Sequence, residues 1–205
     1  MSHDPLPAAD ARFPRLYLIT AARPDLGAFL DAAVRGGVDL VQIRDKQLPD
    51  RELIPVLHEA RQVTRRLRVP LVVNDRPDLA ALVGSDFVHV GQDDLPVDVA
   101  RRFGVSVGLS THAPGEIDAA DADYIGVGPV FATPTKEGRP AVGLDLVRYA
   151  ATNAKQPWFA IGGIDERNIA GVVAAGAERI AVVRALGDAP DPGAAAAALR
   201  AALPG

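Results

Sequence analysis

The sequence contains no cysteine, and this absence excludes disulfide bonds and thiolate chemistry. It has no apolar run long enough to span a bilayer, and residues 1–14, with three prolines, lack the apolar segment of a signal peptide. Basic residues are not in excess, because 22 Lys and Arg face 26 Asp and Glu. The formal net charge of −4 argues against a sequence-independent nucleic-acid binder, although a local basic pocket can still hold a small anion. We therefore expect a cytoplasmic protein without a membrane or nucleic acid among its partners.

What the sequence does contain is an alternation of short apolar runs and longer amphipathic stretches. The runs predict strands at Leu16–Thr20, Leu40–Arg44, Pro70–Asn74, Phe87–Val90, Ser106–Ser110, Tyr124–Val127, Trp158–Ile161 and Ile180–Val183. The stretches predict helices at Leu26–Arg35, Pro49–Leu67, Pro77–Leu82, Val97–Phe103, Pro114–Ala120, Leu144–Ala151, Arg167–Ala175 and Pro192–Leu203.

Strands separated by helices predict parallel βαβ units, and 205 residues with no linker fit one domain. Eight such units on a short chain favour an α/β fold of the (β/α)₈ TIM-barrel type over an open doubly wound sheet. An open sheet that binds a dinucleotide would need G-x-G-x-x-G after its first strand, where Ala21-Ala22-Arg23-Pro24 stands instead. We expect a flexible arm over residues 1–14 and a catalytic barrel over residues 15–205.

Polar side chains gather where the second predicted strand ends. Gln42, Arg44 and Lys46 share one side of the chain, opposite Val41 and Ile43, and face either the barrel mouth or the outer helices. Charges in either dry place are costly, so the pattern predicts a nearby anion. The alternative is a solvated pair of Arg44 with Asp39 or Asp45.

Acidic residues follow the third and fourth predicted strands. Asp75 comes after Asn74, and Asp94 comes after Asp93, from which spacing alone does not separate it. Each carboxylate could cap the helix that follows. Two carboxylates on one rim can instead share a Mg²⁺ ion, which takes one or two carboxylates together with substrate phosphates.

The remaining candidates lie after the fifth to eighth strands. Ser110 could bind a phosphate or cap a turn, and His112, ahead of Ala113-Pro114, is more typical of a structural histidine. The long connection 128–140 is typical of a phosphate-clamping lid, because it combines two threonines with two cations. Barrel phosphate sites often follow strands seven and eight, where the chain has Gly162-Gly163, Val183 and Arg184. The candidates in the connection are Thr133, Thr135, Lys136 and Arg139.

Six motifs in order resemble the thiamine phosphate synthase family. They are Gln42-Ile43-Arg44-Asp45-Lys46, Asn74-Asp75, Gly91-Gln92-Asp93-Asp94, Gly108-Leu109-Ser110, Gly128-Pro129-Val130-Phe131 with Thr133-Pro134-Thr135-Lys136, and Ile161-Gly162-Gly163-Ile164. The resemblance covers nearly the whole chain from about residue 16.

This resemblance implies a transferase that couples a hydroxymethylpyrimidine diphosphate to a hydroxyethylthiazole phosphate through a pyrimidine carbocation, with release of pyrophosphate. It implies Mg²⁺ on Asp75 and Asp94, and phosphorylated small molecules as substrates, with a homo-oligomer left open. By the same similarity the thiazole phosphate would contact Thr133, Thr135, Gly163, Val183 and Arg184. The pyrimidine diphosphate would contact Gln42, Arg44, Lys46, Asn74, Ser110 and Lys136. One departure is Arg184, which stands where many family members have serine.

Three alternative functions stay open: a tautomerase-like or regulatory relative, another phosphate-binding barrel such as a sugar-phosphate epimerase or an aldolase, and a non-enzymatic ligand sensor of the same fold. Thiazole tautomerase-like or regulatory relatives share the barrel without synthase activity, but they would not need the complete set of cations and carboxylates. An aldolase would need a Schiff-base lysine inside a strand, whereas Lys46, Lys136 and Lys155 lie at strand ends or in loops.

Overall fold

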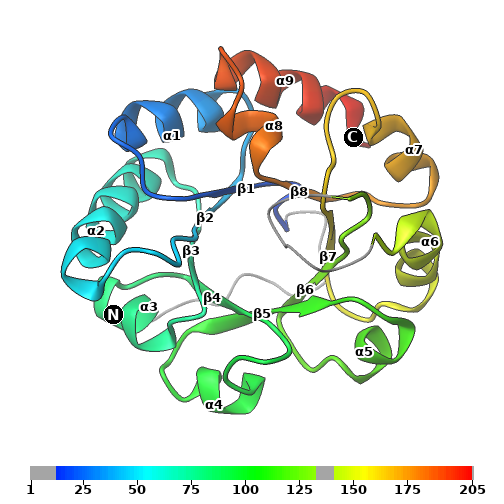
Figure 1. The fold of residues 1–205 in the computed structure, drawn as a ribbon, viewed down its shortest axis with the longest axis horizontal. Coiled ribbons are helices and arrows are strands. Elements are labelled where there is room, and N and C mark those ends of the chain that lie inside the picture. The colour runs from blue at the N-terminus through cyan, green and yellow to red at the C-terminus, as the bar shows by residue number, and fades with distance from the viewer. Residues whose placement is uncertain (1–12, 133–140, 205) are drawn as a thin grey trace.

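The computed structural model describes residues 13–132 and 141–204 and shows a closed parallel barrel. Its strands follow one another in chain order, and β8 pairs with β1 to close the ring (Figure 1). The prediction of a single-domain (β/α)₈ barrel is confirmed. The strands are β1 Leu16–Thr20, β2 Leu40–Ile43, β3 Leu71–Asn74, β4 Phe87–Val90, β5 Ser106–Thr111, β6 Tyr124–Val127, β7 Trp158–Ile161 and β8 Ile180–Val182.

Helices surround this barrel on its outside (Figure 1). They are α1 Leu26–Arg35, α2 Asp50–Leu67, α3 Pro77–Val83, α4 Val97–Arg101, α5 Pro114–Ala119, α6 Gly143–Asn153, α7 Ile169–Ala174, α8 Arg184–Gly187 and α9 Pro192–Ala202. The sequence did not predict α8, a four-residue helix that begins directly after β8. None of the helices in the described ranges is long and apolar enough to cross a membrane.

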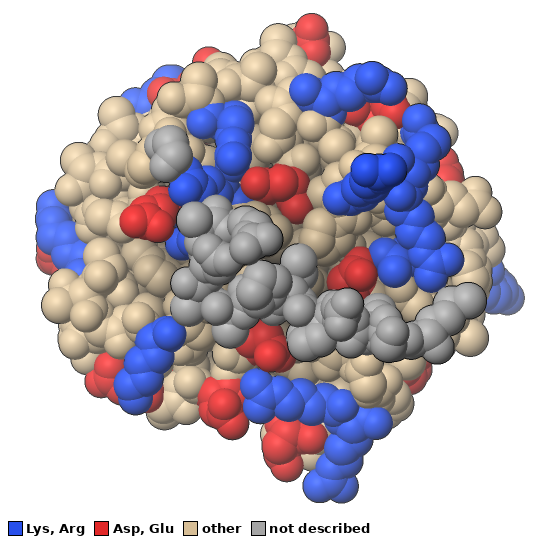
Figure 2. Space-filling view, turned by 180° about the vertical axis from the view of Figure 1, so that it is seen from behind, with Lys and Arg blue, Asp and Glu red and all other residues tan. Residues whose placement is uncertain are grey.

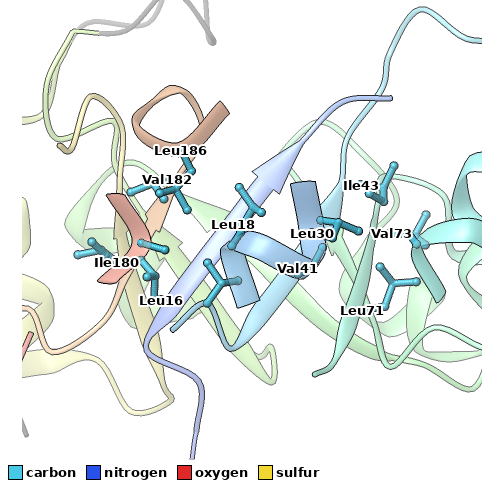
Figure 3. Packing of buried hydrophobic residues seen from close by; sticks show 14 of the residues in the cluster. Leu16, Leu18, Leu30, Val41, Ile43, Leu71, Val73, Ile180, Val182 and Leu186 are labelled. Atoms are coloured by element: carbon cyan, nitrogen blue, oxygen red, sulfur yellow. The ribbon is translucent and has the colours of Figure 1, made fainter. Parts of the chain in front are cut away.

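Alternate residues of each strand point outward and pack against the helices. Leu16 and Leu18 of β1, Val41 of β2 and Val182 of β8 are buried in one continuous apolar cluster with Leu30 of α1 (Figure 3). This cluster explains why the strands read as nearly continuous apolar runs, since both of their faces are covered.

The other alternate residues fill the barrel interior with aromatic rings. Tyr17, Tyr124 and Phe159 are buried there with Phe87, and Phe13 packs on three of these rings at centroid distances of 6.0 to 6.4 Å. Phe13 is 4 % exposed and therefore belongs to the barrel core. Residues 1–12, which make up most of the predicted arm, lie outside the described residues.

The last described residues of the chain lie beside the start of β1. The Arg15 guanidinium donates a hydrogen bond to the Pro204 carbonyl, and α9 packs beside α1. On the side opposite to that seen in Figure 1, Lys and Arg side chains are intermixed with Asp and Glu rather than gathered in one basic patch (Figure 2).

Candidate active site

A cavity of about 630 Å³ opens at the carboxyl ends of the strands. Every strand or the loop that follows it contributes to the lining, which is where barrels of this type place their chemistry. All of the predicted site residues within the described ranges line this one cavity. They are Gln42, Arg44, Lys46, Asn74, Asp75, Asp94, Ser110, Gly163, Val183 and Arg184.

The predicted lid residues Thr133, Thr135, Lys136 and Arg139 lie outside the described residues. The described start of the same connection is tied to β7, because the amides of Val130 and Phe131 donate to the carbonyl oxygens of Ile161 and Gly162. Backbone pairing thus fixes Val130 and Phe131 beside the end of β7.

The second strand directs its polar residues into the barrel and not toward the helices. Gln42 is 1 % exposed and donates through Nε2 to the Tyr17 hydroxyl. Arg44 and Lys46 lie on the same side of the strand end and are progressively more exposed to solvent. The carboxylates that could have paired with Arg44 bind elsewhere. Asp45 accepts from the Gln47 and Leu48 amides, and Asp39 accepts from the Arg15 and Leu16 amides.

Asp75 lies between a cation and a second carboxylate. Its Oδ2 is 2.8 Å from Nζ of Lys46, and its side chain also contacts that of Asp94. Burial raises the pKa of the Asp75 carboxyl above its ordinary value; Lys46 opposes this rise, and Asp94 adds to it. Two touching carboxylates of like charge need a cation between or beside them to stay ionised together.

Helix capping does not explain either carboxylate. The N-cap positions of α3 and α4 are Arg76 and Pro96, and neither makes a side-chain capping hydrogen bond. Asp75 has a left-handed backbone with φ of 59°, and Asp94 accepts from the Gly91 amide at 2.7 Å. Both side chains are therefore held at the rim in loop conformations that precede the helices.

This donor set fits a hard divalent cation. Mg²⁺ binds through one or two carboxylates and completes its shell with water and substrate phosphate oxygens. Asp75 and Asp94 supply two such carboxylates next to each other. Among the described residues no group of three or more His, Cys, Asp or Glu side chains is arranged to hold a metal, so a protein-only metal cage does not arise there.

The loop after β7 presents backbone on the opposite side of the cavity. Gly162 and Gly163 have φ of 105° and 66°, and a Cβ on Gly162 would stand 2.6 Å from Cα of Pro129. Asn168 holds this loop with both ends of its amide, donating to the Gly163 carbonyl at 2.8 Å and accepting from the Asp165 amide at 3.0 Å. Glycine is required here for both its conformation and its lack of a side chain.

Next to this loop, α8 begins at Arg184 on the cavity wall, with Val183 at its N-cap position. Backbone amides at the start of a helix are suited to an anion, and the exposed Arg184 side chain adds a positive charge. The arrangement places a second anion-compatible region at the ends of β7 and β8, which β1 separates from β2 and its Arg44 and Lys46.

Sequence reasoning missed several residues of the cavity wall. His89 of β4 lines the cavity and contacts Ser110 Oγ through Nε2 at 2.9 Å. Asp165 and Arg167 after β7 form an ion pair at its edge. A signal for His89 existed, because it alternates with outward-facing Val88 and Val90 and so shares the inward side with Phe87.

His112, in contrast, has contacts of a structural kind. Its ring Nδ1 lies 2.5 Å from the Gly128 carbonyl oxygen, and its amide donates to Glu116 of α5 at 2.6 Å. It does not line the cavity.

The barrel and its rim cavity define a TIM-barrel enzyme, and the comparisons with known proteins specify which one. Residues 16–186 match the family model described as thiamine monophosphate synthase. The chain therefore belongs to the thiamine monophosphate synthase family, as its motifs predicted, and is a transferase.

Individual relatives match this chain over nearly its full length and theirs. The chain is 51 % identical to the thiamine-phosphate synthase of Arthrobacter sp. strain FB24, with 92 % of this chain and 94 % of that protein covered. It is 52 % identical to the thiamine-phosphate synthase of Thermus thermophilus, with 93 % and 98 % covered. Among solved structures, thiamine phosphate pyrophosphorylase from Pyrococcus furiosus superposes with a TM-score of 0.84 at 33 % identity, covering 92 % of this chain and 94 % of that one.

Proposed function

We propose that this chain couples 4-amino-2-methyl-5-hydroxymethylpyrimidine diphosphate to 4-methyl-5-(2-phosphooxyethyl)thiazole, forming thiamine phosphate and pyrophosphate with the assistance of Mg²⁺. The observation that carries the proposal is the division of one cavity into two anion-compatible sides. Arg44, Lys46 and the Asp75–Asp94 pair lie on one side, and the Gly162-Gly163 loop and the start of α8 lie on the other.

The first side suits a leaving diphosphate. Arg44 and Lys46 offer positive charge where the diphosphate gains negative charge as the bond between its oxygen and the pyrimidine methylene breaks. Asp75 and Asp94 would hold Mg²⁺, which when bound neutralises charge on phosphate oxygens. Gln42, Asn74 and Ser110 lie deeper in the cavity and would contact the pyrimidine diphosphate there, with Lys136 completing the set.

The second side suits the phosphate of the thiazole. Gly163, the Val183–Arg184 backbone and the Arg184 guanidinium would contact that phosphate, together with Thr133 and Thr135. This contact would direct the thiazole nitrogen toward the pyrimidine methylene.

The bond changes balance without a protein base. The C–O bond breaks first, its electron pair leaves with pyrophosphate, and the methylene becomes a carbocation. The nitrogen lone pair of the thiazole then forms the new C–N bond and gives the thiazolium product. No proton is removed in either step, so the proposed reaction needs none of the Asp or His side chains of the cavity wall to act as a base.

The test combines the purified protein with both phosphorylated substrates and Mg²⁺, and measures thiamine phosphate and pyrophosphate. We expect both products in equal amounts. Thiazole-phosphate binding without any coupling product would reject the synthase and favour a tautomerase-like or regulatory relative.

Arg184→Ser checks the assignment of the second side. We expect a modest rise in KM for the thiazole phosphate and an unchanged KM for the pyrimidine diphosphate. An unchanged KM for both would remove Arg184 from the phosphate site.

A further inference from the structure

A chain of hydrogen-bonded side chains crosses the barrel interior beneath the cavity. It starts at Gln42 of β2, which donates to the Tyr17 hydroxyl of β1. The Tyr17 and Tyr124 hydroxyl oxygens are 3.0 Å apart, and the Tyr124 oxygen is 3.1 Å from Nδ1 of His89. Nε2 of His89 then lies 2.9 Å from Ser110 Oγ, so both ends of the hydrogen-bond chain, Gln42 and Ser110, lie in the cavity wall together with His89.

The side chains that pack inside the barrel hold the two tyrosines of this hydrogen-bond chain in place. Tyr17 and Tyr124 are 2 % and 0 % exposed, with their rings in an edge contact at 6.0 Å. Gly108 of β5 makes the space for Tyr124, since a Cβ at this position would lie 2.1 Å from Cζ of the tyrosine. The phenols therefore occupy one position each, and burial raises the pKa of both, so both stay protonated.

The buried contacts determine which group donates and which accepts at each hydrogen bond of this series. Among the described residues, the Tyr17 hydroxyl contacts two polar groups, Gln42 and Tyr124. Because Gln42 Nε2 donates to Tyr17, the proton of Tyr17 has an acceptor only if it points to Tyr124. A buried hydroxyl proton without an acceptor is costly, so Tyr17 donates to Tyr124, and Tyr124 in turn donates to Nδ1 of His89.

We propose that Tyr17, Tyr124 and His89 are positioning residues that fix the donor and acceptor pattern of the substrate pocket. The chain runs from Gln42 through Tyr17 and Tyr124 to His89, whose proton is on Nε2 and is donated to Ser110. Ser110 Oγ accepts this bond, so its own proton is directed to an acceptor other than His89. The Oε1 atom of Gln42 would then accept a hydrogen bond from a donor on the substrate.

The pattern suits a heteroaromatic ring that carries an amino donor beside a ring-nitrogen acceptor. This inference rests on the proposed function, because the diphosphate substrate named there carries an aminopyrimidine of this kind. None of the three positioning residues needs to contact the substrate, since each acts through Gln42 or Ser110.

The first arm of the test needs no substrate. In ¹⁵N-histidine-labelled wild-type protein, the ring nitrogens of His89 are assigned by comparison with His89→Gln, because the chain has four histidines. We expect a neutral ring protonated on Nε2, and a loss of this single tautomer in Tyr124→Phe. A wild-type proton on Nδ1 would show the opposite direction and overturn the proposal.

The second arm measures kinetics in Tyr124→Phe and Tyr17→Phe, which keep the aromatic rings. We expect KM for the pyrimidine diphosphate to rise about tenfold, as for one lost hydrogen bond, with KM for the thiazole phosphate within twofold of wild type. Tyr149→Phe is the matched control, since its hydroxyl bonds Asp118 on the exposed surface, and it should leave both constants unchanged.

The two hypotheses fail in different ways. A wild-type protein that forms no thiamine phosphate rejects the proposed function. The tautomer of His89 then still tests the direction of the hydrogen-bond chain, because this measurement needs no substrate. A wild-type protein that couples both substrates, with unchanged KM in Tyr124→Phe, rejects the positioning role.

Discussion

Asp75 shows how a single side chain at the rim can be set up for a cation. It touches Lys46 and Asp94, and burial raises the pKa of its carboxyl. In Asp75→Asn the negative charge is lost and the shape is kept, so we expect turnover to fall about a hundredfold while the fold survives. Steady-state rates over a Mg²⁺ titration, with circular dichroism for the fold, measure both effects.

Asp98→Asn provides the comparison, because Asp98 is exposed on α4 and lies away from the cavity. It should keep the wild-type rate at every Mg²⁺ concentration. A near wild-type rate in Asp75→Asn would instead show that the cation is bound elsewhere.

Arg76, the residue after Asp75, joins two helices through their carboxylates. It contacts Asp50 at 2.7 Å and Asp78 at 2.6 Å, and these hydrogen bonds lower the pKa of both carboxyls. A lowered pKa in the fold stabilises the folded state above the unfolded-state pKa of about 3.9, and this contribution is lost as the pH falls.

We therefore expect the unfolding free energy of Arg76→Gln to fall less steeply than that of wild type between about pH 5 and pH 2. Urea denaturation at a series of pH values measures the slope. Arg148→Gln removes a single exposed pair with Asp145 and should follow the wild-type curve. Parallel curves for Arg76→Gln and wild type would contradict the assignment.

At the scale of an element, the loop after β7 depends on backbone that only glycine accommodates. Gly162→Ala would place Cβ against the Pro129 backbone at a φ of 105°, so we expect a loss of about 1–3 kcal/mol in the free energy of unfolding. It should also raise KM for the thiazole phosphate, because the neighbouring Gly163 would move.

Gly115→Ala is the control for this prediction, since a Cβ at Gly115 in α5 meets nothing within 4 Å. Denaturant titration should show no loss of stability for this variant. Equal stability of the Gly162 and Gly115 variants would mean that the loop can relax without cost.

The strands were predictable because buried parallel strands and amphipathic helices leave distinct patterns in the chain. The predicted β1, β4, β6 and β7 have the observed bounds, and the others differ by one residue at an end. Helix α8 was missed because four residues that directly follow a strand carry too little periodicity. Arg184 was accordingly predicted to follow the eighth strand, without the helix that begins there.

The site was predictable to the extent that the ends of the strands can be located from the sequence. Gln42, Asn74 and Ser110 stand at such ends, and the structure brings them to one cavity with the glycines after β7. The contacts of His89 with Tyr124 and Ser110 were not predictable, because they depend on the register between β4, β5 and β6 in the closed barrel.

At the scale of the whole molecule, one ring packs against the aromatic cluster inside the barrel. Phe13 precedes β1 and contacts Phe87, Tyr124 and Phe159. We expect Phe13→Ala to lower the free energy of unfolding by about 3–5 kcal/mol, because a buried ring would leave a void among these side chains. Thermal and urea denaturation measure this loss.

Phe103→Ala is the matched substitution on the surface, since Phe103 is 42 % exposed. It should change stability by less than about 1 kcal/mol. A similar small effect for Phe13→Ala would show that the barrel interior repacks around the missing ring.

The hydrogen bond between Arg15 and Pro204 places the end of α9 beside the start of β1, whereas the cavity opens at the strands' carboxyl ends. A solid support coupled through the last residues of the given chain would thus hold the barrel by the end opposite to the cavity. The mouth of the cavity would then face the bulk solution and stay accessible to diffusing substrates.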